Sequence, residues 1–311
     1  MTLLWVLLAL TALVFLAGFY GFVFVFVRRR QVDIHDAEAV EQSSWSPHAK
    51  RIAWALQWLE TLPVELWQVV SYDGKKLVGH FIPCENAKGT LIQFHGYRST
   101  FALDFSASME FYHDLGYNLL LCEQRGNGLS EGKLITFGIR ERMDVLSWAT
   151  YAGLKLGQEH PIFLSGLSMG ATSVLMASDM EFPANVRGLL ADCGFTSPGD
   201  IIRHLLKERY RLPQKLTIWL LNFYTRLLAG FTLDEWSTEK ALRNAKYPVL
   251  FVHGLEDDYV PSFMTRRAYE ACTSEKTLLE FPEAGHGLSY LVDMPRYQQA
   301  LRTFLLKHTE G

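Results

Sequence analysis

Short apolar runs alternate with helix-like amphipathic stretches through most of the chain from residue 66 onward. The runs show no apolar–polar alternation, which is typical of strands that are covered on both faces of a parallel sheet. A hairpin about Asp73-Gly74 precedes them, with strands at residues 66–71 and 77–83. The pattern predicts an α/β fold with a mostly parallel central sheet flanked by helices. The later strands are expected at residues 90–94, 117–122, 161–166, 186–193, 247–253 and 277–281, and helices at 105–115, 139–156, 263–272 and 295–307.

The N-terminal segment differs, because residues 2–27 carry no charge and consist mainly of Leu, Val, Phe and Ala. As a helix they reach about 39 Å at about 1.5 Å per residue, enough to cross a hydrocarbon core of about 30 Å. A cleaved signal peptide fits less well, since no Lys or Arg precedes the run and Arg28-Arg29-Arg30 stands where small residues would guide cleavage. Residues 1–30 are therefore predicted to be a transmembrane anchor with a basic flank. The positive-inside rule places the following domain on the cytoplasmic side.

Residues 31–65 combine a polar linker with a helical patch formed by Ile52, Ala53, Leu56 and Leu59. The patch is accompanied by Trp45, Trp54 and Trp58, which suit either the membrane surface or packing on the domain, and packing is the favoured interpretation. Residues 66–311 are predicted to form one domain.

Between residues 193 and 247 the strands stop and only helical patterns remain. This region, about 197–244, is predicted to form a small helical cap over the C-terminal edge of the sheet. Most of its apolar residues are expected to seat the cap, and a subset is the candidate lining of an acyl-chain slot. The two apolar stripes consist of Ile201, Ile202, Leu205, Leu206 and Tyr210, and of Ile218, Trp219, Leu220, Leu221, Phe223, Tyr224, Leu227 and Leu228.

Composition narrows the possible functions. The 311 residues are 49% hydrophobic with a net charge of −3 and no basic block in the body of the chain, which disfavours a nucleic-acid partner. No phosphate-cradling glycine loop is present, and neither a cofactor nor a metal is expected. The cysteines lie far apart without a C-x-x-C pair, which favours free thiols over disulfides; they are Cys84, Cys122, Cys193 and Cys272. Nothing in the sequence fixes an oligomeric state.

The strongest chemical signal is Gly166-Leu167-Ser168-Met169-Gly170, which lies between a predicted strand and a predicted helix. This G-x-S-x-G pattern in that context indicates a nucleophile elbow, with Ser168 at the apex and the Met169 N–H as an oxyanion donor. The pattern alone occurs by chance in roughly one chain in ten of this length. A serine that only caps the helix is therefore the alternative.

A serine nucleophile needs a base and an orienting acid, which in this topology follow it on loops after late strands. His286, within Gly285-His286-Gly287, follows the last strand and is the candidate base. The loop after residues 247–253 offers Asp257 as the acid, and spacing alone leaves its neighbours open. The competing carboxylates are Glu256, Asp258 and Asp192, and the competing histidines His95 and His253 are interpreted as structural.

The second oxyanion donor should come from the loop after the strand at residues 90–94. That loop is His95-Gly96-Tyr97-Arg98, and the Tyr97 N–H is the candidate. Arg125, in a glycine-rich turn, is assigned no catalytic role.

From about residue 66 to 308 the sequence resembles the α/β-hydrolase superfamily. It is most similar to a bacterial membrane-anchored serine-hydrolase branch related to serine aminopeptidases and monoacylglycerol-lipase-like esterases. The family pattern H-G-x-x-D-x-x-V-P falls on Asp257, which favours it over its neighbours, while Glu123 departs from an aspartate that many relatives carry. The matching motifs are His95-Gly96-Tyr97-Arg98-Ser99, Arg125-Gly126-Asn127-Gly128-Leu129-Ser130, Gly166-Leu167-Ser168-Met169-Gly170, Ala191-Asp192-Cys193-Gly194, His253-Gly254 with Asp257 and Val260-Pro261, and Gly285-His286-Gly287.

The resemblance implies a catalytic triad of Ser168, His286 and Asp257 that cleaves a small-molecule acyl substrate. Carboxylic esters are expected over amides, because no acidic pocket for a substrate amine is evident. The alternatives are a peptidase or amidase, an acyltransferase, and a membrane-tethered binding protein without turnover.

Overall fold

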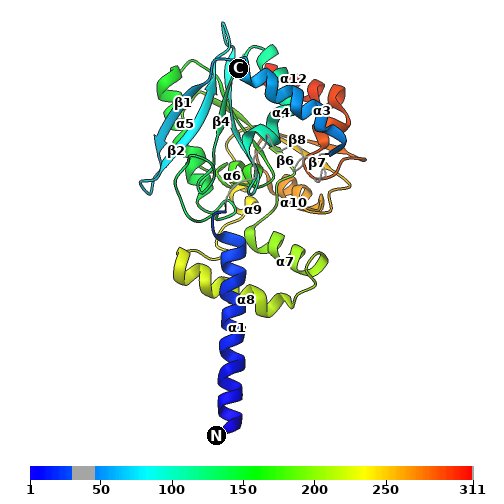
Figure 1. The fold of residues 1–311 in the computed structure, drawn as a ribbon. Helices are drawn as coiled ribbons and strands as arrows, with labels where there is room; N and C mark the ends of the chain where they lie inside the picture. The colour runs from blue at the N-terminus through cyan, green and yellow to red at the C-terminus, as the bar shows by residue number, and fades with distance from the viewer. Residues whose placement is uncertain (30–45, 310–311) are drawn as a thin grey trace.

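A twisted eight-stranded sheet forms the centre of the protein (Figure 1). The computed structural model describes residues 1–29 and 46–309. The strand order is β1-β2-β4-β3-β5-β6-β7-β8, in which β1 and β4 each pair antiparallel with β2 and the remaining pairs are parallel. The strands are β1 (Glu65–Val70), β2 (Lys76–Ile82), β3 (Gly89–Phe94), β4 (Tyr117–Cys122), β5 (Ile162–Leu167), β6 (Val186–Asp192), β7 (Val249–Gly254) and β8 (Lys276–Phe281). Every residue of β3, β4, β5 and β7 is buried, as the unbroken apolar runs predicted.

Helices cover both faces of the sheet (Figure 1). One face packs on α5 (Glu141–Leu156), α6 (Met169–Met176), α9 (Thr238–Leu242) and α10 (Phe263–Ala271). The other packs on α4 (Phe101–Asp114), α11 (Ser289–Val292) and α12 (Met294–Thr309), with η1 (Ser46–His48) and α3 (Ala49–Glu60) outside α4. Helix α4 begins four residues before its predicted start, because the Thr100 hydroxyl accepts a hydrogen bond from the Leu103 N–H at 3.1 Å and caps the helix.

The helical patch before the domain packs on the body through α3. Ile52, Ala55 and Leu56 are buried against α4, whereas Ala53 is exposed, so the predicted stripe was wrong at that position. Trp58 is half-buried, with its ring 5.6 Å from that of His113, and Trp54 is exposed beneath the Arg51 guanidinium. Arg30, Trp45 and the predicted linker at 31–45 lie outside the described residues.

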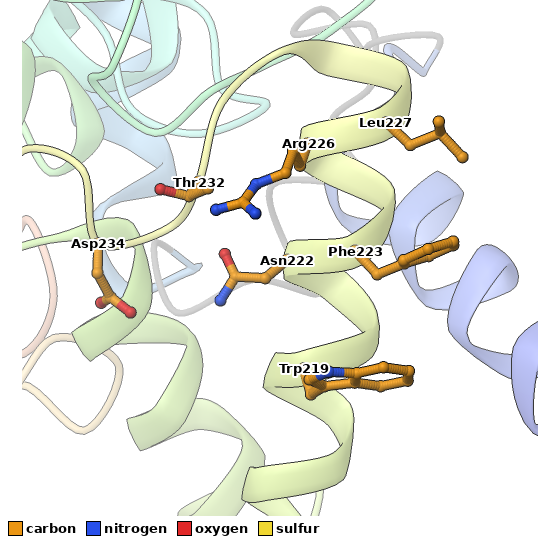
Figure 2. A pocket seen from close by; sticks show the side chains of 7 residues that line it. All are labelled: Trp219, Asn222, Phe223, Arg226, Leu227, Thr232 and Asp234. Carbon is orange, nitrogen blue, oxygen red and sulfur yellow. The ribbon is translucent and has the colours of Figure 1, made fainter.

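The cap region contains α7 (Pro198–Glu208), α8 (Gln214–Tyr224), the π-helical turn η2 (Thr225–Ala229) and α9. Most of its first stripe is buried, although Tyr210 is exposed. The second stripe differs from the expectation that most of its residues seat the cap, since Trp219, Phe223, Leu227 and Leu228 are exposed. In Figure 2, Trp219 and Phe223 point toward α1, where they contact the Phe15 ring, while Asn222 and Arg226 point to the opposite side of α8.

Helix α1 (Thr2–Phe26) packs on the body at its C-terminal end, while its N-terminal end projects away from the body (Figure 1). Residues 1–14 are all exposed, and Phe15 is the first that is partly buried. Phe22 and Phe26 belong to the same buried cluster as Phe137 and Phe231. A backbone hydrogen bond also joins α1 to the body, since the Ile135 N–H donates to the Phe26 carbonyl at 2.8 Å. The apolar helix is therefore part of the folded body rather than a loose tether.

Candidate active site

Ser168 stands at the sharp turn between β5 and α6. Its backbone is left-handed, with φ 55° and ψ −115°, which is strained for a residue with a side chain. The flanking glycines permit the close approach of strand and helix: a Cβ on Gly166 would lie 2.3 Å from the Gly170 carbonyl carbon, and one on Gly170 would lie 1.8 Å from the Phe94 oxygen. This is the geometry of a nucleophile elbow.

His286 reaches Ser168 from the loop after β8. Its Nε2 lies 3.0 Å from the Ser168 Oγ, and its Nδ1 lies 2.7 Å from the Asp257 Oδ2. The imidazole is a quarter exposed, whereas the Asp257 side chain is fully buried. The structure thus brings the three predicted residues into one hydrogen-bonded chain, although 118 positions separate Ser168 from His286.

Asp257 is held by four donors. Its Oδ1 accepts the N–H groups of Tyr259 at 3.0 Å and Val260 at 2.8 Å. Its Oδ2 contacts His286 and lies 3.3 Å from the His253 Nε2. Burial raises the pKa of Asp257, but hydrogen bonds from His253 and His286 outweigh it and lower the pKa to about 2. The carboxylate therefore stays ionised at neutral pH.

The other candidate acids lie elsewhere. Glu256 and Asp258 are exposed. Asp192 is buried, and its carboxylate accepts the hydroxyls of Tyr297 at 3.0 Å and Ser289 at 3.4 Å. Among these four carboxylates, Asp257 is therefore the one hydrogen-bonded to His286.

The two competing histidines are buried beside the site. His95 accepts the Gln124 N–H at its Nε2 and contacts the Gly96 carbonyl through its Nδ1, and burial lowers its pKa, which favours the neutral ring. His253 contacts Thr265 and the Val260 carbonyl as well as Asp257. Sequence reasoning missed the contact between His253 and the acid, although their i, i+4 spacing across a tight loop was a usable signal.

The loop that carries Tyr97 lies against Ser168, because a Cβ on Gly96 would be 3.3 Å from the Ser168 Cβ. The Gly96 N–H donates to the buried Asp104 Oδ2 at 2.6 Å, and the Ser99 hydroxyl donates to the same carboxylate. Asp104 thus fixes the loop, a role that sequence reasoning missed. An acidic residue in the first turn of the helix after the loop was the available signal.

Met169 is fully buried and is the first residue of α6. The first N–H groups of a helix have no partner within the helix. The Met169 N–H therefore lies at the helix end beside Ser168, where a developing negative charge is favoured.

Two further clusters near the site have structural explanations. Arg125 is buried and binds Asp144 through two contacts of 2.6 Å and Asp73 through two longer ones, so it holds its turn. Cys193 lies within 4.8 Å of Asp257 and His286, a set of residue types that could bind a metal. Burial raises the pKa of Cys193 well above its usual value, which disfavours the thiolate that a metal requires.

Comparison with known proteins adds to this geometry. No known family profile matches the chain. It is 26% identical over 304 residues to the uncharacterised protein YqkD of Bacillus subtilis, covering 96% of each chain. It is 25% identical to the uncharacterised membrane protein YNL320W of Saccharomyces cerevisiae, covering 79% of this chain and 81% of that protein.

Among solved structures, the Pyrococcus furiosus esterase Pf2001 superposes with a TM-score of 0.68 at 20% identity, over 91% of this chain and 98% of the esterase. The chain has the α/β-hydrolase fold. The resemblance read from the motifs is confirmed at this level, together with the mostly parallel sheet and flanking helices. In this α/β-hydrolase fold the elbow, the loop after β7 and the loop after β8 converge at one edge of the sheet.

Proposed function

We propose that this protein is a serine hydrolase that cleaves carboxylic esters through an acyl-enzyme. Ser168 is the nucleophile, His286 the general base and Asp257 the residue that orients the imidazole. The observation that carries the proposal is the continuous hydrogen-bonded chain of Ser168 Oγ, His286 and Asp257, with contacts of 3.0 and 2.7 Å. A fold hosts many activities, so the argument depends on this site and not on the fold.

The proposed reaction has two halves. The Ser168 Oγ attacks the ester carbonyl and passes its proton to the His286 Nε2. The N–H groups of Tyr97 and Met169 stabilise the resulting oxyanion, the C–O bond to the alcohol breaks, and the alcohol leaves with the proton from His286. Water then attacks the acyl-enzyme with His286 again acting as base. The acid is released and Ser168 regains its proton.

The surroundings of the site favour an apolar acyl group over an amine-bearing peptide. A cavity of about 540 Å³, whose walls include Tyr97 and Tyr259, is lined almost entirely by apolar and aromatic side chains. Among the described residues lining it, Arg98 is the charged one, and no carboxylate is present to bind a substrate amine.

We further propose that α1 is a single transmembrane anchor with the catalytic domain on the cytoplasmic side. The helix has 25 residues, and the relative YNL320W is described as a membrane protein. A cleaved signal peptide would remove Phe22 and Phe26 from a buried cluster, which argues for retention. The Arg28 guanidinium donates to the Ser130 carbonyl at 2.9 Å, so the basic flank also contacts the body.

Purified full-length protein in detergent tests the reaction. We expect hydrolysis of p-nitrophenyl esters to exceed that of aminoacyl anilides, and to be lost in Ser168→Ala. The matched control is Ser147→Ala, which removes a hydroxyl on α5 that donates to the Met143 carbonyl at 3.0 Å.

Faster anilide cleavage would reassign the protein as an amidase or peptidase. Product that forms only with an added alcohol or amine would indicate an acyltransferase. Folded protein that hydrolyses no ester across a broad panel would support the binding-protein alternative.

A further inference from the structure

The cavity whose lining includes Tyr97 and Tyr259 has α1 as one of its walls. Val14, Ala17, Gly21 and Phe24 of α1 face Ile202 and Leu216 of the cap region across about 540 Å³. Pockets for small molecules have volumes of about 300–1,000 Å³ and largely apolar walls. A space of this size and lining accommodates an extended hydrocarbon chain.

Small residues on α1 shape this space. A Cβ on Gly18 would lie 2.9 Å from the Leu220 Cβ, so Gly18 lets α1 and α8 touch. Gly21, one turn further on, lines the cavity, and a Cβ there would meet Leu221 at 3.5 Å, an ordinary van der Waals contact that requires no neighbour to move. The α1 surface thus combines a close contact at Gly18 with small cavity-lining residues at Ala17 and Gly21.

Two residues that line the cavity, Tyr259 and Tyr97, connect it to the candidate active site. The Tyr259 ring is 5.2 Å from that of His286, and the Tyr259 N–H donates to Asp257. On the other side, the Tyr97 hydroxyl donates to the Val25 carbonyl of α1 at 2.6 Å. A chain whose carbonyl end passes Tyr97 and Tyr259 to reach Ser168 would have its tail between α1 and the cap region.

The outer end of the cavity lies within the depth of α1 that the hydrocarbon core of a bilayer would surround. Residues 2–14 precede the first partly buried position of α1 and reach only about 20 Å at about 1.5 Å per residue. A bilayer core of about 30 Å must then also surround the next turns of α1. Those turns pack on α8, where the Phe15 ring lies 5.8 Å from Trp219 and 5.5 Å from Phe223.

The exposed side of α8 and η2 suits that depth. Trp219, Phe223 and Leu227 are exposed to water in the isolated chain, and Figure 2 shows the two rings on the α1 side of the helix. The two rings lie beside Phe15 of α1, and the residues of α1 before Phe15 are all exposed, so one apolar surface runs across both helices. This favours lipid over a second protein as the partner that covers the surface.

We infer that this cavity binds one long acyl chain of a membrane lipid ester, which reaches Ser168 sideways from the near leaflet between α1 and the cap region. The inference rests on the proposed esterase function and names its substrate class. In this arrangement α1 is part of the binding site, so the anchor and the acyl pocket are the same element.

Chain-length selectivity in lipid nanodiscs tests the inference. Gly21→Phe fills the cavity, and we expect it to lower the ratio of kcat/KM for a C16 ester to that for a C4 ester at least about tenfold. Ala12→Phe is the matched control, because Ala12 is exposed and lies on the opposite side of α1 from Gly21, nine residues away. An unchanged ratio in Gly21→Phe with retained Ser168-dependent hydrolysis would overturn the inference and leave the esterase function standing.

A binding measurement separates the two proposals. We expect a diazirine-bearing palmitate to crosslink Ile202 and Tyr259 in Ser168→Ala protein in nanodiscs, and Gly21→Phe to reduce these adducts. Adducts without any ester hydrolysis by wild type would support the lipid site and contradict the esterase. Adducts confined to the exposed residues of α1, equal in both variants, would contradict the lipid site whatever the activity.

Discussion

The carboxyl edge of the sheet and the face formed by α1 and the cap region are held together in different ways. At the sheet edge, Asp257 is buried and accepts hydrogen bonds from backbone N–H groups and imidazoles. At the other face, apolar contacts such as Gly18 on Leu220 join the helices, and large side chains such as Trp219 stay exposed. The first region is held by short polar contacts, whereas the second leaves large apolar side chains exposed.

The two regions meet at the loop after β3. Tyr97 donates its hydroxyl to the Val25 carbonyl, and the Arg98 guanidinium donates to the carbonyls of Phe24 at 2.7 Å and Val27 at 3.0 Å. These carbonyls lie at the C-terminal end of α1, where the last carbonyls of a helix have no N–H partner within it. The partial negative charge at that end favours a cation such as the Arg98 guanidinium. The proposed oxyanion loop is thus hydrogen-bonded directly to α1.

The largest expected effect is the loss of ester hydrolysis when triad residues at the sheet edge are removed. Ser168→Ala and His286→Ala should each lower kcat for ester hydrolysis by about 10⁴-fold or more, because neither residue acts without the other. The double variant should be no slower than either single one. Steady-state kinetics with thermal unfolding as a folding control checks this, and additive losses would mean that the two residues do not work as a unit.

A substitution at the α1 face should instead lower the stability of the folded protein. Phe26→Ala removes a fully buried ring from the cluster that joins α1 to the body, and should lower the free energy of unfolding by about 3–5 kcal/mol. Leu16→Ala, on the exposed side of the same helix, should change it far less. Denaturation in detergent measures both, and equal small effects would show that α1 is only loosely attached.

Acid should weaken the sheet edge in a defined pH range. The pKa of Asp257 falls from 3.8 to about 2 on folding, so its ionised form stabilises the folded state above about pH 4. That contribution, about 2 kcal/mol, is lost as pH falls through the folded pKa. The stability difference between wild type and Asp257→Asn should therefore shrink between pH 5 and pH 2, while Asp258→Asn, at an exposed position, serves as the control. A difference that is independent of pH would contradict the hydrogen bonds assigned to Asp257.

The smallest expected effect concerns the connection between the regions. Arg98→Ala leaves carbonyls of α1 without their donor and should lower the free energy of unfolding by about 1–3 kcal/mol. It should also speed hydrogen exchange at residues 24–27 and lower kcat several-fold. Arg29→Ala is the control, since Arg29 is exposed and stacks on the Phe24 ring. Faster exchange with unchanged kcat would mean that the loop is fixed by Asp104 alone.

Much of the body was predictable because its signals are local. The unbroken apolar runs identified β3, β4, β5 and β7, and Gly166 and Gly170 marked the elbow because no side chain fits there. Spacing alone could not select among three adjacent carboxylates, since the choice depends on which one the turn buries. Asp257 is that residue because its own loop donates two N–H groups to it.

The α1 face was not predictable in the same way. The contacts of Tyr97 and Arg98 with α1 carbonyls span more than 70 positions, and no periodicity reports them. The exposure of Trp219 and Phe223 also depends on where α1 lies beside α8. The sequence shows both apolar segments and predicts an anchor and a cap, but it carries no signal that the two together enclose a cavity.

Labelling with a fluorophosphonate, followed by peptide mass spectrometry, is the sharpest test that Ser168 is a nucleophile activated by His286. The account predicts one adduct, on Ser168, in the wild-type protein, with labelling abolished in Ser168→Ala and slowed by orders of magnitude in His286→Ala. An adduct on another residue, or equal labelling of wild type and Ser168→Ala, would contradict it.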